Sequence, residues 1–206
     1  VMTAQRLTLL AGADDLYAMP LAVTLFSALT SVKRGEAVTL YLIDGGIGEP
    51  QRRRLERVLA GSPVDLEVRW VRPLTDPGTD AMRALPEPPP GYLTVAANYR
   101  LFAPYLVPEP RVLYLDSDVI VRHDLRAVFS EELRGHTVAA VLDASFPSLG
   151  DSISSWREQG LDPDLPYFNS GVLLIDLDRW RAEGTAAALL ANLHVHAASY
   201  KHHDQD

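Results

Sequence analysis

The segment Val112–Asp118, VLYLDSD, decides the fold and carries the sharpest chemical signal in the sequence. Its first four residues are all apolar, which is typical of a short strand buried on both faces. Asp116 and Asp118 follow at once, where the chain leaves the predicted strand. Open α/β sheets bind ligands at the carboxyl ends of their strands. The segment therefore predicts a buried sheet with a polar site at a strand exit.

Short apolar runs alternate with helical patterns on both sides of this segment. In the helix predicted after Pro50, for example, Leu55, Val58 and Leu59 follow the spacing of a helix packed on one face. The alternation predicts an α/β domain, with a mostly parallel, Rossmann-like sheet and helices on both faces. The predicted strands are 6–11, 38–43, 65–71, 112–115, 137–142 and 171–177. The predicted helices are 20–30, 50–61, 94–103, capped by Thr94, and 179–193, capped by Asp178.

The segment Pro73–Gly91 interrupts the alternation with six prolines. No helix interior or sheet ladder tolerates that density of proline. Because strands and helices resume afterwards, we interpret the segment as a surface excursion inside one domain. The whole chain, 1–206, is therefore predicted to be a single domain.

Composition excludes several classes of protein. The net charge is -8, the opposite sign to that of a duplex-binding protein, so nucleic acid is not expected as a partner. The sequence has no cysteine, which excludes disulfides, thiolate catalysis and cysteine-based zinc sites. No apolar run approaches the roughly 20 residues of a transmembrane segment. These features predict a cytoplasmic, soluble chain.

Asp116 and Asp118 suggest a metal site. Two carboxylates that flank one residue at a strand exit can converge on one hard cation. Oxygen ligands suit magnesium or manganese, and such ions usually share their coordination with substrate phosphates. The alternative is a polar turn beside a helix cap, because Asp-x-Asp is a common pattern. The position directly after a buried strand favours the metal site.

Two other polar turns each allow two interpretations. In Gly12-Ala13-Asp14-Asp15, one aspartate can cap the next helix, and these residues taken alone favour that interpretation. Alternatively, Gly12 and Ala13 let a nucleotide ring approach the backbone while Asp14 accepts a hydrogen bond from a base N–H. Asn169 fits either a turn or a hydrogen bond to a sugar hydroxyl, since an amide both donates and accepts.

Motifs of other enzyme classes are absent from the sequence. There is no Gly-x-Ser-x-Gly, no Walker A loop and no Gly-x-Gly-x-x-Gly, which disfavours serine hydrolases, P-loop NTPases and Rossmann dehydrogenases. A zinc site formed by the histidines near residues 194–203 is conceivable. However, His194 and His196 are two residues apart and do not share a helix face, so solvated or core histidines are favoured.

Five segments in fixed order resemble glycosyltransferase family 8, and together they span almost the whole chain. They are ADDLYA at 13–18, YRLF at 99–102, VLYLDSDV at 112–119, YFNSGVLLI at 167–175 and HDQD at 203–206. The resemblance implies a GT-A-type fold, a nucleotide-sugar donor, usually a UDP-hexose, and a bound manganese or magnesium ion. It also implies transfer of the hexose to a carbohydrate, lipid or protein acceptor, with retention at the anomeric carbon.

The resemblance assigns roles to individual residues. Asp14 and Tyr17 would contact the uracil, beside Gly12 and Ala13. The remaining assignments are metal binding for Asp116 and Asp118, donor-sugar contacts for Arg100, Asn169 and Asp204, and a position beside the anomeric carbon for Gln205, with Asp143 as a further site carboxylate. Gln205 is an amide and a poor nucleophile, so attack from the same face as the leaving group is favoured.

The sequence departs from the family pattern at two places. Leu16 stands where relatives often carry a polar residue, and the sequence ends at Asp206, before the histidine metal ligand of the family. We therefore expect residues 1–206 to be a catalytic domain truncated at its C-terminus. Two alternatives remain open, a nucleotidyltransferase that makes nucleotide-sugars and a degenerate domain that binds them without catalysis. The acceptor, the choice between glucose and galactose, and the oligomeric state also stay open.

Overall fold

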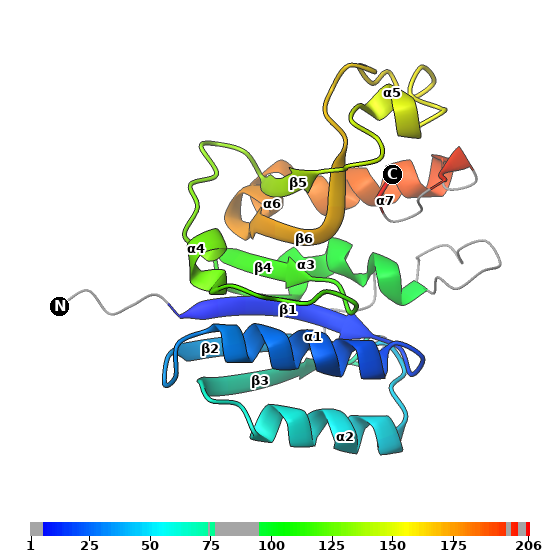
Figure 1. The fold of residues 1–206 in the computed structure, drawn as a ribbon. Helices are drawn as coiled ribbons and strands as arrows, with labels where there is room; N and C mark the ends of the chain where they lie inside the picture. The colour runs from blue at the N-terminus through cyan, green and yellow to red at the C-terminus, as the bar shows by residue number, and fades with distance from the viewer. Residues whose placement is uncertain (1–5, 74, 77–94, 197–198, 202–204) are drawn as a thin grey trace.

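The computed structural model describes residues 6–73, 75–76, 95–196, 199–201 and 205–206. Its centre is a six-stranded sheet (Figure 1). The strands are β1 (Leu7–Ala13), β2 (Ala37–Asp44), β3 (Asp65–Val71), β4 (Arg111–Leu115), β5 (Val138–Leu142) and β6 (Phe168–Asp176). Their spatial order is β3-β2-β1-β4-β6-β5, with β3, β2, β1 and β4 mutually parallel. β6 runs antiparallel between β4 and β5.

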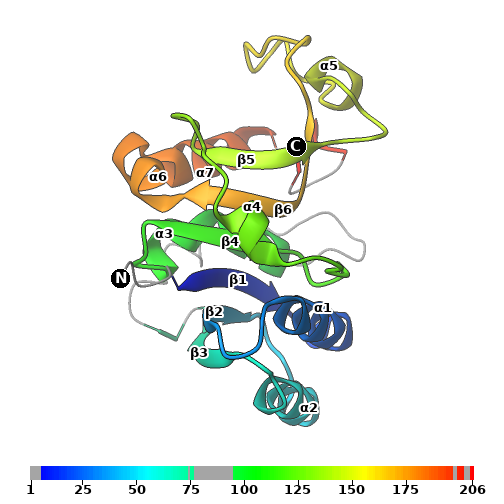
Figure 2. The same cartoon turned by 60° about the vertical axis from the view of Figure 1, so that its left-hand side comes forward.

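Helices cover both faces of this sheet (Figures 1 and 2). The longer ones are α1 (Ala18–Ser31), α2 (Glu49–Ala60) and α7 (Thr185–His196). The shorter ones are the 3-10 helix η2 (Val95–Phe102), α3 (Ala103–Leu106), α4 (Leu125–Phe129), α5 (Leu149–Ser152) and α6 (Leu177–Glu183). The predicted α/β class, with a mostly parallel sheet, is therefore confirmed.

Alternate residues of the central strands feed two separate cores, because successive side chains of a strand point to opposite faces. Leu9 of β1 and Leu113 of β4 are paired neighbours and pack in the core beneath α1 and α2. Leu10 and Tyr114 are the next pair and pack in the other core, with residues of η2, α6 and α7. This alternation places Tyr114 on the side of the sheet that η2 covers.

Several element boundaries differ from those predicted. Helix α1 begins at Ala18, two residues before Pro20, since the missing N–H of proline is tolerated anywhere in the first turn. The predicted helix 94–103 is instead the 3-10 helix η2 followed by the single turn of α3, and its predicted cap, Thr94, lies outside the described residues. The excursion Pro73–Gly91 also falls mostly outside them.

The C-terminal half contains two further corrections. The last strand begins at Phe168, three residues before the predicted start. The predicted helix 179–193 is two helices, α6 and α7, because Gly184 adopts the left-handed conformation with φ of 66° and ends the first one. The cap of α6 is Asp176, whose carboxylate accepts from the N–H of Arg179 at 2.9 Å, and not Asp178.

Candidate active site

The predicted site residues include those that follow the ends of β1, β4 and β5 and those at the beginning of β6. Because β6 is antiparallel to β4, its first residues lie beside the exit of β4, and the N–H of Asp116 donates to the carbonyl of Gly171 at 2.8 Å. β1 is the other neighbour of β4, and the two are parallel. The turn that follows Ala13 therefore lies at the same edge of the sheet as Asp116.

Asp116 is anchored through one of its two carboxylate oxygens. Its Oδ1 accepts from the Tyr114 hydroxyl at 2.6 Å and from the Arg100 guanidinium at 3.0 Å. Arg100 also donates to the Ser170 carbonyl at 2.7 Å and stacks over the Tyr114 ring at 4.5 Å. With a side chain only 5% exposed, Arg100 needs this compensation, since a buried guanidinium without a carboxylate partner is costly. The network fixes the orientation of Asp116.

The remaining carboxylate oxygens at this turn suit a divalent cation. Within the described part of the chain, Oδ2 of Asp116 accepts no hydrogen bond, and the exposed Asp118 makes neither a hydrogen bond nor an ion pair. Those residues contain no group of three or more histidine, cysteine or acidic side chains able to hold a metal. Two carboxylates fit magnesium or manganese when phosphate and water oxygens complete the coordination. The donor set therefore fits the implied ion.

Gln205 joins two residues that are far apart in the sequence. Its Nε2 donates to Oδ2 of Asp143 at 2.9 Å, and its Oε1 accepts from Nδ2 of Asn169 at 3.3 Å and from the N–H of Ser170 at 3.4 Å. The bond from Gln205, followed by that from the N–H of Ser145, lowers the pKa of Asp143. The structure thus brings Asp143, Asn169 and Gln205 together, with Asp143 ionised at neutral pH.

Asp206 holds the chain next to Gln205. Its carboxylate accepts from the Tyr167 hydroxyl, from Ser152 Oγ at 3.1 Å and from the N–H of Lys201 at 2.6 Å. Burial, followed by the hydrogen bond to Asp206, raises the pKa of Tyr167. Gln205 is therefore held in place by its own hydrogen bonds and by those of Asp206, the next residue. Asp204, predicted to hold the donor sugar, lies outside the described residues.

The last two residues of β1 and the turn that follows it have structural roles. Asp14 accepts from the N–H of Tyr17 at 3.0 Å within the turn before α1. The N-cap of α1 is Tyr17, which has no side-chain cap bond, and Asp15 accepts from the N–H of Gly48, so the predicted aspartate cap is wrong. The side chain of Ala13 is buried, and Tyr17 packs partly against the core under α1. A Cβ at Gly12 would lie 2.7 Å from the Cβ of Ile43, so this glycine is required by close approach of the neighbouring strand. Their predicted contacts with a nucleotide remain predictions.

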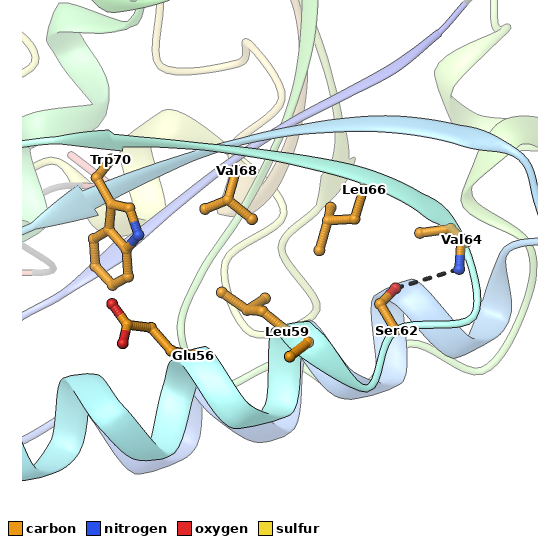
Figure 3. A pocket seen from close by; sticks show the side chains of 8 residues that line it. Glu56, Leu59, Ser62, Val64, Leu66, Val68 and Trp70 are labelled. Atoms are coloured by element: carbon orange, nitrogen blue, oxygen red, sulfur yellow. Dashed lines mark hydrogen bonds between the residues drawn. The ribbon is translucent and has the colours of Figure 1, made fainter.

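Two cavities lie outside this cluster. One, of about 280 Å³, is lined by residues after β2 and β3 and by Tyr99 of η2, the neighbour of Arg100. The other, of about 370 Å³, is an apolar groove between α2 and β3 (Figure 3). Leu59 of the helix faces Leu66 and Val68 of the strand across it. Neither cavity is lined by Asp116 or Gln205.

Sequence reasoning missed two contributors, Tyr114 and Ser170. A signal for Tyr114 was present, because residues two apart on a strand share a face and Tyr114 precedes Asp116 by two. Ser170 contributes only backbone groups, its carbonyl to Arg100 and its N–H to Gln205. Every residue type has a backbone carbonyl, and every type except proline has a backbone N–H, so the sequence does not indicate contacts of this kind.

Known proteins similar to this chain are glycosyltransferases and their relatives. General stress protein A of Bacillus subtilis (strain 168) is 31% identical over 199 residues, covering 94% of this chain and 65% of that protein. The glycosyltransferase GlyF of Streptococcus pneumoniae is 27% identical and covers 90% of this chain and 40% of its own length. The chain thus spans less than two thirds of either relative.

A solved structure of the galactosyltransferase LgtC, in complex with donor and acceptor sugar analogues, shares the fold. Its TM-score is 0.71 at 24% identity, and the match covers 97% of this chain and 68% of that one. An active-site mutant of LgtC gives a TM-score of 0.76. The predicted GT-A-type fold is therefore confirmed. Within the described residues, no helix has both the length and the apolar character of a membrane span. The family model described as "Glycosyl transferase family 8" matches residues 8–206, and the chain belongs to that family.

Proposed function

We propose that this chain is the donor-binding part of a retaining, divalent-metal-dependent glycosyltransferase. It would move a hexose from a UDP-hexose to a carbohydrate, lipid or protein acceptor. One observation carries the proposal: Arg100 and Tyr114 anchor one oxygen of Asp116, while its other oxygen and the carboxylate of Asp118 carry no partner among the described residues. Membership of glycosyl transferase family 8 supports the same reaction class.

Asp116 and Asp118 would hold the manganese or magnesium ion, which supplies Lewis-acid stabilisation of the negative charge on the departing diphosphate. Arg100 supports this arrangement from the buried side. Its guanidinium is committed to Asp116 and to the Ser170 carbonyl, so its first duty is to orient the carboxylate. We therefore refine the role of Arg100 from a sugar contact to a positioning residue that also borders the donor site.

Gln205, Asn169 and Asp143 form the candidate sugar side of the site. Donation from Nε2 of Gln205 to Asp143 fixes the amide and directs its carbonyl oxygen toward Asn169. An amide oxygen in this position can support positive charge at the anomeric carbon but is a poor nucleophile. Asp143 is held by three donors, Gln205 and the N–H groups of Ser145 and Phe146, which reduces its own nucleophilicity. This arrangement favours attack from the same face, and Asp204 is proposed to bind the sugar as well.

The nucleotide side is proposed to lie at the turn after β1. Asp14 uses Oδ1 for the N–H of Tyr17, and its second oxygen, which accepts no hydrogen bond from the described residues, would accept from a base N–H. Tyr17 would stack on the uracil at the beginning of α1. Gly12 and Ala13 would border the base through their backbone, because Gly12 has no side chain and the side chain of Ala13 is buried.

Hydrolysis of UDP-hexose, with manganese and with chelator, tests the proposal against its two alternatives. Release of UDP and hexose only with manganese supports the transferase. Formation of UDP-hexose from UTP and hexose 1-phosphate would identify a nucleotidyltransferase, and binding without turnover would identify a degenerate domain. Asp118→Asn should abolish turnover. Asp65→Asn is the matched control, because Asp65 starts β3 at the opposite edge of the sheet.

A further inference from the structure

Helix α1 exposes an apolar stripe on the side that faces away from the sheet. Each of its four apolar members is between 51% and 71% exposed. They are Leu16, just before the helix, and Met19, Val23 and Phe26. Figures 1 and 2 show that no other described element lies over this side of the helix. Ala18–Ser31 contains no charged residue, so no charge within α1 keeps this side hydrated.

A neighbouring loop widens the stripe. Thr24 of α1 donates to the carbonyl of Val119 at 2.7 Å, and the N–H of Val121 donates to Ser27 at 2.9 Å. These bonds hold residues 119–121 along the helix, and Ile120 between them is 69% exposed. Large apolar side chains exposed on neighbouring segments in this way indicate an interaction site.

The apolar members of the stripe have the spacing of a helix-pairing seam. Leu16, Met19 and Phe26 lie at positions -7, -4 and +3 from Val23, so with Val23 on a two-fold axis Phe26 lies within one residue of the level of Met19 in the second copy. An antiparallel copy of the same helix presents the same pattern in reverse. The stripe is therefore complementary to itself across a two-fold axis that passes near Val23.

The charges at the two ends of α1 select the antiparallel arrangement. Asp15 precedes the helix and Lys33 and Arg34 follow it, and all three are exposed. With the axis near Val23, an antiparallel pair brings Asp15, before the helix in one copy, toward Lys33 and Arg34, after the helix in the other. A parallel pair would instead place like charges together. We propose that α1 is the interface of a homodimer, in which two copies pair antiparallel through this stripe.

A lipid surface is the rival occupant, but the charges oppose it. Asp14 and Asp15 flank the stripe at one end, and the protein carries a net charge of -8. Both features repel the anionic headgroups that attract peripheral proteins. The tests of the dimer are independent of the proposed enzymatic reaction, since Val23 and Phe26 lie outside the proposed site, whereas Leu16 lies between Asp14 and Tyr17 of it.

Disulfide trapping tests the interface directly, because the sequence has no cysteine. Val23→Cys places one thiol near the two-fold axis and should give a covalent dimer under mild oxidation. Val195→Cys, at an exposed position on α7, is the control and should remain monomeric. Equal cross-linking of the two variants, or none at Val23→Cys, would overturn the proposal.

Sedimentation velocity over a concentration series gives a second measurement. Phe26→Lys should raise the dimer dissociation constant at least tenfold, whereas Val195→Lys should leave it unchanged. Circular dichroism checks that both variants fold. A parent protein that is monomeric throughout the series would contradict the dimer, and flotation of that monomer with anionic vesicles would assign the stripe to a lipid surface.

Discussion

Replacing Tyr114 by phenylalanine removes one hydroxyl from the base of the candidate metal site. The ring, which is buried and stacked under Arg100, is retained. The change deletes the 2.6 Å hydrogen bond to Oδ1 of Asp116 and leaves the bond from Arg100 to the same oxygen. It therefore asks whether the tyrosine hydroxyl orients Asp116 for its proposed ligand.

The structure sets the expected size of the effect. A hydrogen bond to a charged group contributes about 1.5–3 kcal/mol. Asp116 keeps its bond to Arg100, and its side chain is 30% exposed, so water replaces part of what is lost. The free-energy cost of losing the Tyr114 hydroxyl should therefore lie near the lower limit of this range, about 1.5 kcal/mol. Since 1.4 kcal/mol corresponds to a factor of ten, manganese-dependent UDP affinity should fall about tenfold.

Two measurements separate the role of Tyr114 in the site from a purely structural one. Calorimetric titration with UDP in manganese measures binding, and urea denaturation measures the free energy of unfolding. Tyr105→Phe is the control, because Tyr105 is exposed and forms no hydrogen bond among the described residues. If Tyr114→Phe lowers stability but binds UDP as tightly as the parent protein, the hydroxyl does not position Asp116 for the ligand.

Three further substitutions test other parts of the site. Gly171→Ala would place a methyl group 3.0 Å from Oδ1 of Asn169 and 3.1 Å from Oδ2 of Asp116, so donor affinity should fall more than stability, and unchanged affinity would remove both oxygens from the site. Gln205→Ala should lower turnover more than donor binding, and in a carboxyl NMR titration it should raise the pKa of Asp143 toward its usual value near 4. Because its pKa is lower in the folded protein, ionised Asp143 stabilises the fold above its usual pKa, and this contribution is lost as pH falls through the folded-state pKa. If Gln205→Ala leaves the pKa of Asp143 unchanged, the hydrogen bond from Gln205 to Asp143 is absent. Tyr17→Ala should weaken UDP itself by about 1–3 kcal/mol, by analogy with base stacking in single-strand binders, and equal UDP affinity would exclude the stacking role.

Much of the sheet was predictable because its central strands are continuous apolar runs. The β4 residues Val112–Leu115 were found this way, since burial on both faces leaves little choice of residue. The direction of β6 was not predictable, because a strand of either direction has the same apolar sequence. The break at Gly184 was also missed, since glycine is tolerated within helical patterns and only the observed φ shows that it ends α6.

Some residues of the candidate site were likewise predictable from the sequence, and others were not. Asp116 and Asp118 follow from local sequence, because a strand exit is recognisable from the residues before it. The contact between Asp143 and Gln205 joins residues 62 apart. Asp143 is recognisable as a carboxylate that follows a predicted strand, but only resemblance to a family indicated Gln205. Gly12 has a structural requirement that the sequence did not indicate, because a glycine expected to admit a nucleotide ring is also required for the close approach of Ile43.

The affinity for UDP-hexose, measured by calorimetry in manganese and in chelator, tests the central claim most directly. The parent protein should bind in manganese and lose most of its affinity in chelator. Asp118→Asn keeps the size of the side chain but removes its charge, so it should bind weakly in both media, while Asp65→Asn should behave as the parent does. Binding by Asp118→Asn as tight as that of the parent, in manganese and in chelator alike, would contradict the metal site.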